Sequence, residues 1–185
     1  SITVFDQAVI AARSAQHLED LLSAAPNVNT ASGASRGRFI QIRGVGERSQ
    51  FVEPVNASVA MLLDGIDLTG LGAAATTWDI QQIEILRGPQ GTLLGANALA
   101  GLISLNSTAA DSSGLKFAMG AENNGGSRLA AAGGGELTDN ISGRVAIEQY
   151  RSDGAIKNTY LNRRHTQRKD ELTSRGGLAW KGANQ

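Results

Sequence analysis

The sequence lacks cysteine and has few histidines, and both shortages exclude classes of site. Without cysteine there are no disulfides, cysteine-ligated zinc ions, iron–sulfur clusters or catalytic thiols. His17 and His165 lie far apart in the chain, so a histidine-rich metal site is not expected. Seventeen basic residues balance 17 acidic ones, so the chain has no basic excess for binding nucleic acid. We therefore expect no cofactor, no metal and no nucleic acid as partners.

Long hydrophobic runs are also missing. The longest, such as Val59–Leu63, fall far short of the roughly 18 residues that a membrane-spanning helix needs. Aromatic residues make up only 4%, whereas 23 glycines are too many for a helical bundle. Residues 1–108 mix short apolar runs with helix signals, and residues 115–185 alternate between apolar and polar residues. A turn-rich linker at 109–114 separates the two parts.

The first part is predicted to be an α+β domain. Short strands are expected over residues 2–5, 39–42, 58–63, 83–86 and 102–105. Ser14 is expected to cap a helix that Pro26 ends, with His17 on its exposed side. The buried stripe of this helix follows the i, i+3, i+4, i+7 spacing and consists of Leu18, Leu21, Leu22 and Ala25.

Three unusually long connections interrupt this domain. They cover residues 32–38 (the first loop), 45–55 (the second loop) and 67–77 (the third loop). Long ordered loops on a rigid scaffold commonly carry binding residues. We therefore look for ligand contacts in these loops.

The second part is predicted to form four antiparallel strands. One face carries Leu115, Phe117, Met119, Val145, Ile147, Leu178 and Trp180. The other face carries Lys116, Arg144, Glu148 and Arg175. Strands of about nine to eleven residues with this alternation are typical of membrane β-barrels. The alternation alone slightly favours a soluble meander that rests one face on a core, because the barrel signal of each single strand is weak.

The residue types present argue against two functions, nucleotide binding and catalysis. The glycine-rich stretch 88–95 resembles a nucleotide-binding loop, but Ala96 and Asn97 follow where a P-loop needs Lys and Ser or Thr. Asp64, Asp67 and Asp79 are spread over different elements, and no nucleophile is paired with a base. The sequence therefore does not predict an enzyme.

Residues 79–108, DIQQIEILRGPQGTLLGANALAGLISLNST, closely resemble the last segment of the plug domain of TonB-dependent outer-membrane receptors. Three upstream landmarks occur in the family's order: LEDLLSAAPNV, an I-R-G strand end at 42–44 and a D-G-I strand end at 64–66. Asn27 replaces the usual glycine, but asparagine tolerates the left-handed conformation. The alternating tail resembles the first strands of the family's barrel.

The resemblance implies the fold and the function of the chain. The fold class is an α+β plug domain (1–108), followed after the linker by antiparallel strands of an incomplete transmembrane β-barrel (115–185). Related barrels close about 22 strands, so the chain is expected to be truncated. The implied function is import of a scarce bulky nutrient, of the metal–siderophore, cobalamin or oligosaccharide class, through the bacterial outer membrane. The alternative is a free-standing, plug-like periplasmic binding or interaction module.

The resemblance also implies partners and site residues. Energy would come through TonB, whose engaging segment would precede Ser1, and the apolar face of the tail would contact outer-membrane lipid, with Tyr150 and Trp180 near its interfaces. Arg43 and Arg87 would lock the plug to acidic residues of the barrel wall. The loop candidates for ligand contact are Ser35, Arg36, Glu47, Arg48, Gln50, Thr69 and Leu71.

A basic stretch separates the third and fourth alternating strands. It contains Arg163, Arg164, His165, Arg168 and Lys169. It is either a solvated loop or a contact for an anionic ligand or lipopolysaccharide.

Overall fold

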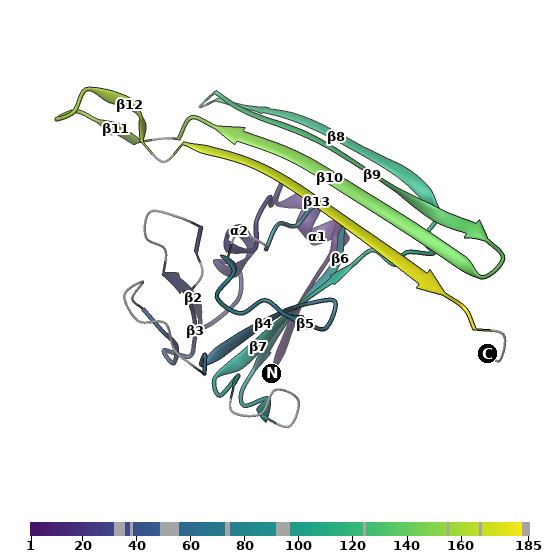
Figure 1. Cartoon of the computed structure of the whole chain (residues 1–185). Coiled ribbons are helices and arrows are strands. Elements are labelled where there is room, and N and C mark those ends of the chain that lie inside the picture. Colours follow the sequence, from purple (N-terminus) through teal and green to yellow (C-terminus); the bar gives the residue numbers. More distant parts are fainter. Residues whose placement is uncertain are drawn as a thin grey trace. The chain divides into compact units, whose positions relative to one another are not determined.

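The structure of the chain is a computed structural model (Figure 1). It describes residues 1–31, 36–37, 39–48, 56–72, 75–91, 97–123, 125–154, 156–166 and 168–182. The chain forms two compact units, Ser1–Ser107 (the plug unit) and Thr108–Gln185 (the strand unit). Within the described ranges, no helix has the length and apolar composition needed to cross a membrane.

The plug unit is a mixed sheet with two short helices and a separate hairpin. Its elements are β1 (Ile2–Asp6), α1 (Gln7–Ala12), α2 (Leu18–Leu22), β2 (Val28–Ala31), β3 (Phe39–Ile42), β4 (Val59–Leu63), β5 (Ile66–Asp67), β6 (Ile80–Arg87) and β7 (Gly101–Ser107). The five-stranded sheet has the order β1-β6-β7-β4-β5. The pair β4–β7 is parallel and the other pairs are antiparallel, while β2 and β3 form the hairpin. The predicted α+β class is confirmed.

Side chains of the capping type start both helices. Asp6 ends β1 and accepts from the Val9 N–H at 2.8 Å, which starts α1. The predicted cap at Ser14 is wrong, because Ser14 lies in the left-handed turn after α1 at φ +49°. His17 caps α2 instead, and Asp20 closes the capping box.

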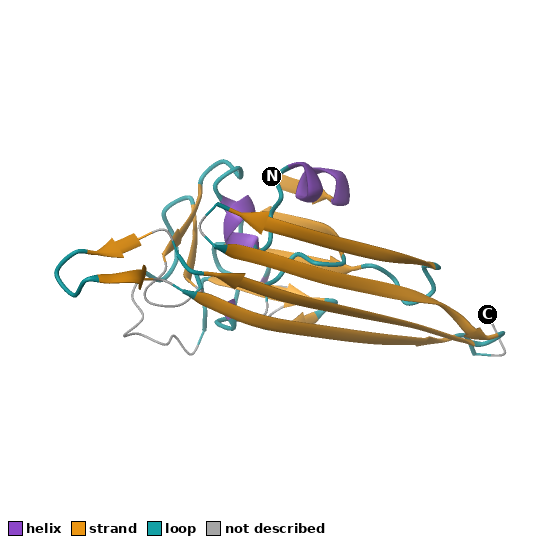
Figure 2. Cartoon of the chain, turned by 90° about the horizontal axis from the view of Figure 1, so that it is seen from above, coloured by secondary structure: helices purple, strands orange, loops and turns teal. Residues whose placement is uncertain are grey.

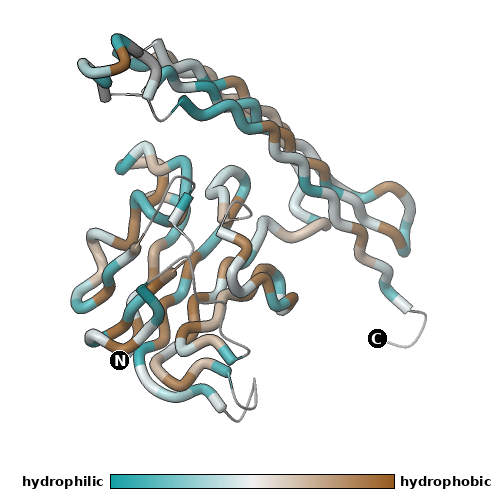
Figure 3. Tube along the Cα trace, turned by 60° about the vertical axis from the view of Figure 1, so that its left-hand side comes forward, coloured by the Kyte–Doolittle hydropathy of each residue, from teal (hydrophilic) through white to brown (hydrophobic). Residues whose placement is uncertain are grey.

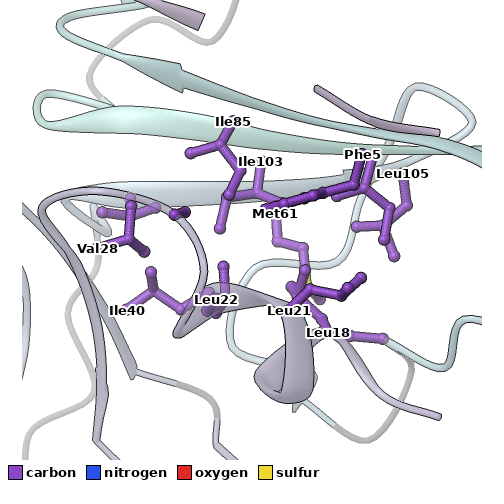
Figure 4. Close-up of a cluster of buried hydrophobic side chains, with 14 of the residues drawn as sticks. Phe5, Leu18, Leu21, Leu22, Val28, Ile40, Met61, Ile85, Ile103 and Leu105 are labelled. Carbon is purple, nitrogen blue, oxygen red and sulfur yellow. The ribbon is translucent and has the colours of Figure 1, made fainter. Parts of the chain in front are cut away.

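The apolar face of α2 packs on the sheet and makes the core of the plug unit (Figure 4). The predicted stripe of Leu18, Leu21, Leu22 and Ala25 is buried throughout. It meets alternate residues of the strands, among them Phe5, Met61, Ile83, Ile85, Ile103 and Leu105. Burying Leu or Ile side chains of this kind contributes about 1.5–3 kcal/mol each, so this core fixes the sheet and with it the strand ends.

Tight turns end two of these strands. In Arg43-Gly44 and in Asp64-Gly65 both residues have positive φ, between +51° and +81°. Two central residues in this conformation form the type I′ turn that suits the twist of a hairpin. Asn27 has φ +58° after Pro26, which confirms that asparagine preserves the left-handed helix exit.

The strand unit contains four long strands side by side (Figure 2). They are β8 (Gly114–Glu122), β9 (Gly126–Thr138), β10 (Ile141–Ser152) and β13 (Lys169–Trp180), all antiparallel, in the order β13-β10-β9-β8. A small hairpin of β11 (Ile156–Asn158) and β12 (Arg163–Thr166) lies between β10 and β13 in the sequence. The described strands do not close into a barrel.

The register places the apolar residues of the long strands on one face. Phe117 is opposite Ala131, which is opposite Ile147, and Leu115 shares a row with Val145. Lys116 falls in the alternate rows, and hydrophobic and hydrophilic residues alternate along the strands (Figure 3). The exposed large side chains of the apolar face are Leu115, Phe117, Met119, Leu129, Val145, Ile147, Leu172, Leu178 and Trp180. The predicted segregation into two faces is confirmed.

Candidate functional site

Two arginines at the ends of different strands converge on one hydroxyl group. Arg43 follows β3, and its Nη2 donates to Ser1 Oγ at 3.4 Å. Arg87 ends β6, and its Nη1 donates to the same oxygen at 3.3 Å. Arg87 Nη2 also donates to Thr3 Oγ1 on β1. The I-R-G and L-R-G motifs, 44 residues apart in the chain, therefore form one cationic cluster, the arginine pair.

The backbone around the arginine pair explains this convergence. Arg43 occupies the first position of its turn, and its N–H donates to Asn27 O at 2.8 Å. Gly101 pairs with Arg87 across the sheet. A Cβ atom on Gly101 would lie 2.4 Å from Leu86 O and 2.6 Å from Ile42 Cδ1. Glycine at this position therefore lets the end of β3 approach β6 and β7.

The charge of the arginine pair has no carboxylate partner among the described residues of the plug unit. Among the described residues of this unit, no carboxylate lies within 4.0 Å of the Arg43 or Arg87 guanidinium. Glu84 on β6 accepts from Gln82 instead, as expected for a residue on the opposite face from Arg87. Arg87 Nε is buried without a hydrogen-bond partner. Two adjacent cations with an unused donor suit an anionic group such as a carboxylate.

A second polar cluster lies at the first turn of α2. The expected position of His17 on the exposed side of the helix is wrong, because only 1% of this residue is exposed. As the N-cap it has extended backbone angles, φ −139° and ψ 156°, so its ring does not continue the helical periodicity. Nδ1 accepts from the Glu19 N–H at 3.3 Å, and Nε2 lies 2.6 Å from Gly72 O. Both bonds form together only in the neutral tautomer with its proton on Nε2.

The neighbouring carboxylate holds the first loop. Glu19 Oε1 accepts from Arg36 Nη1 at 2.6 Å, and Oε2 accepts from the Gly37 N–H at 2.9 Å. The side chain of Arg36 is only 8% exposed. The first turn of α2 thus contacts residues of both the first and the third loop.

Burial and hydrogen bonds set the protonation states of this cluster. Burial lowers the pKa of His17 below 6.5, and the nearby charge of Arg36 lowers it further. Burial acts to raise the pKa of Glu19, but the hydrogen bonds from Gly37 and Arg36 outweigh it and lower the pKa to about 2. At neutral pH a neutral histidine therefore stands beside an ionised carboxylate.

The predicted ligand residues of the first and third loops occupy different environments. Ser35 lies outside the described residues, and Arg36 is engaged with Glu19 as above. Thr69 Oγ1 accepts from the Met61 N–H at 2.9 Å. Leu71 is 58% exposed. Of these candidates Leu71 projects into solvent, whereas Arg36 and Thr69 fasten their loops to the domain.

The described part of the second loop does not join the first and third loops at α2. Glu47 Oε1 accepts from the N–H and the Oγ of Ser58, at 2.9 and 2.8 Å, directly before β4. The start of β4 pairs with the start of β7, beside Arg87. Arg48 is exposed, and Gln50 lies outside the described residues. The structure therefore brings the first and third loops together at α2 and places Glu47 at the opposite end of the sheet.

The described residues of the strand unit form ion pairs but no candidate metal site. Arg128 Nε bonds to Glu148 Oε1 at 2.6 Å across β9 and β10. In the basic stretch, Arg168 Nη2 lies 3.9 Å from Asp170 Oδ2. The structure does not describe the side chains of residues 163–165. In the part of the chain that the structure describes, no group of three His, Asp or Glu side chains could hold a metal ion.

Comparison with known proteins identifies the family. A family model described as the TonB-dependent receptor plug domain matches residues 1–102. The chain belongs to this family. The pesticin receptor of Yersinia pestis is 36% identical over 73 residues, which cover 40% of this chain and 10% of that receptor. The vitamin B12 transporter BtuB of Vibrio vulnificus is 26% identical over 163 residues, which cover 83% of this chain and 25% of the transporter.

Solved structures share the fold of this plug-family chain. The ferric yersiniabactin uptake receptor FyuA of Yersinia pestis matches 96% of the chain with a TM-score of 0.76 and 24% identity. The ferric-catecholate import receptor Fiu of E. coli matches 86% with a TM-score of 0.68 and 23% identity. The chain spans 28% and 22% of these receptors. The relatives are transport receptors rather than enzymes, and the protein is located in the bacterial outer membrane.

Proposed function

We propose that the protein takes part in energised import of a scarce, bulky nutrient through the outer membrane. One observation carries this proposal: a plug-family domain over residues 1–102 is followed directly by four long strands with one apolar face. Strands of this length and alternation suit a bilayer. The chain acts by binding and conformational change, with TonB as the source of energy.

The nutrient belongs to the metal–siderophore, cobalamin or oligosaccharide class. Relatives named for ferric yersiniabactin, ferric catecholate and vitamin B12 support the first two of these classes. Within the plug unit, the three long loops supply the ligand contacts. Arg48 of the second loop and Leu71 of the third are the described candidates with exposed side chains.

The arginine pair holds the plug in the barrel. Arg43 and Arg87 lie side by side and find no carboxylate among the described residues of their own unit. Arg87 is half-buried and Arg43 is exposed in this chain, and enclosing both inside a barrel is favourable only when their charges are paired. Acidic residues on the barrel wall supply the pairing, so that the plug is fixed until TonB acts on it.

Uptake by whole cells tests the proposed function. The full-length protein is produced in an outer membrane that lacks other receptors of this type, and labelled ferric siderophores, cobalamin and oligosaccharides are offered in turn. We expect uptake of one class, and its loss when TonB is deleted. If none of these compounds enters, or if entry is independent of TonB, the proposal is wrong.

Hydrogen exchange tests the role of the arginine pair separately. In the full-length double variant Arg43→Ala/Arg87→Ala, exchange should rise about tenfold or more across Phe39–Gly44 and Ile83–Gly88, because buried pairs lose their charge partner. The barrel should fold as before. Arg48→Ala is the matched control, since Arg48 is exposed and lies outside the pair. Protection equal to that of the parent protein would leave these arginines as ordinary strand ends.

A further inference from the structure

The first turn of α2 holds residues of two loops at once. Glu19 binds Arg36 and Gly37 of the first loop, at 2.6 and 2.9 Å. His17, two residues earlier, lies 2.6 Å from Gly72 O of the third loop. Gly37 and Gly72 are 35 positions apart in the sequence, so the first turn of α2 links two segments that are distant in the chain.

The third loop is attached to this turn by more than the histidine ring. His17 forms an isolated antiparallel bridge with Thr76. The Leu18 N–H donates to Ala75 O at 2.9 Å, and the Thr77 N–H donates to Gln16 O at 3.1 Å. The end of the third loop is therefore bound as a short strand beside the start of α2.

A hydrogen bond between His17 and Glu19 connects the attachments of the two loops. His17 Nδ1 accepts from the Glu19 N–H at 3.3 Å. The residue that holds the first loop is therefore itself held by the ring that holds the third. Displacement of the ring removes the cap of α2 and frees the backbone from which the Glu19 carboxylate projects.

We propose that His17 and Glu19 are positioning residues that couple the first and third loops, so that a change in one loop is transmitted to the other through the start of α2. The proposal rests on the proposed function, in which these loops contact the ligand. Neither residue needs to touch the ligand, since each acts through the backbone and side chains of its loop.

The coupling depends on the protonation state of the His17 ring. The charged groups that face His17 are Arg36, Glu19 and Asp20. A second ring proton would occupy Nδ1, which then opposes the Glu19 N–H and can no longer accept from it. Acid therefore breaks the link between the His17 ring and the Glu19 N–H at a pH below 6.5, while Nε2–H still donates to Gly72 O and the ionised Glu19 holds the first loop until a lower pH is reached.

Amide hydrogen exchange of the full-length protein in detergent, without ligand, tests the coupling. Glu19→Gln should raise exchange at Gly37 about tenfold, because a charge-assisted bond is lost. It should also raise exchange at Leu18 and Thr77. His17→Asn keeps a capping side chain but removes the ring that reaches the third loop. It should raise exchange at Leu18 and Thr77, and at Gly37 as well.

The controls separate coupling from general loss of stability. Glu136→Gln changes an exposed carboxylate of the strand unit and should leave all these amides unchanged. Exchange across β6 should stay the same in every variant. In the unsubstituted protein, exchange at Glu19, corrected for the intrinsic rate, should rise as the pH falls below 6.5, and through the start of α2 exchange at Thr77 should rise with it. His17→Asn should abolish this dependence.

Three results would overturn the proposal. They are substitutions that affect only their own loop, a rise that includes β6 equally, and a pH profile that His17→Asn leaves unchanged. The pH profile of the unsubstituted protein decides the question even if a variant fails to fold. Because no ligand is present, a negative uptake result would count against transport and leave this coupling untouched.

Discussion

Apolar and polar residues alternate along the strands of both units, but the apolar residues are buried in the plug unit and exposed in the strand unit. In the plug unit, Ile83 and Ile103 are fully buried beneath α2. In the strand unit, Phe117 and Met119 alternate in the same way and are 77% and 84% exposed. The period of two therefore fixes which residues share a face, but not what covers that face.

The length of the strands distinguishes the plug unit from the strand unit. The strands of the plug unit have two to eight residues, and two helices accompany them. The four long strands have nine to thirteen residues, and no helix is found in the described part of their unit. A tilted strand needs about nine to eleven residues to cross the hydrocarbon layer of a bilayer. Only the strand unit meets this requirement.

Removal of matched leucines should give the largest contrast between the units. Leu21→Ala should lower the free energy of unfolding of the plug unit by about 2–5 kcal/mol, because it leaves a cavity in a core where Leu21 is fully buried. Leu178→Ala, at a side chain 79% exposed, should change stability by less than about 1 kcal/mol. The measurement is urea denaturation of the full-length protein in detergent. Similar losses would mean that the outer face of the strand unit is packed.

A charge placed on either face of β8 sharpens the comparison. Phe117→Arg should lower folding stability in a bilayer by about 2–4 kcal/mol if this position lies near the midplane. Ala118→Arg, one residue further on the opposite face, should cost about 1 kcal/mol or less. Reversible folding into lipid vesicles measures both. Equal costs at the two positions would contradict a lipid-facing apolar row.

Acid should weaken the plug unit through Glu19, with a smaller effect. Its folded pKa of about 2 lies below the ordinary value of 4.5, so its stabilisation is fully present above pH 4.5 and is lost as the pH falls toward 2. After allowance for partial exposure, the loss is about 1–3 kcal/mol. Glu19→Gln should flatten this part of the pH profile of unfolding, and Glu136→Gln should not. An unchanged profile in Glu19→Gln would show that the carboxylate contributes nothing.

Local patterns predicted much of the fold. The stripe from Leu18 to Ala25, the turn at Asp64-Gly65 and the two faces of the long strands all follow from short-range periodicity or from residues that accept positive φ. These features depend on neighbours in the sequence, which is why the sequence alone determines them.

The position of His17 could not be obtained in that way. Its burial depends on Gly72, 55 residues away, and on a helix that starts later than expected. The available signal was Asp20 three residues after His17, the spacing of a capping box. The convergence of Arg43 and Arg87 likewise depends on the approach of β3 to Gly101, which no local pattern encodes.

Spin labels along β8 test most directly the central claim that the strand unit turns its apolar face to lipid. Residues 1–185 contain no cysteine, so single cysteines are introduced at positions 115–119, and any cysteine elsewhere in the full-length protein is replaced by serine. In the full-length protein in lipid vesicles, oxygen should reach labels at Leu115, Phe117 and Met119, and a water-soluble nickel reagent should reach labels at Lys116 and Ala118. Equal access of the nickel reagent to both sets would contradict the account.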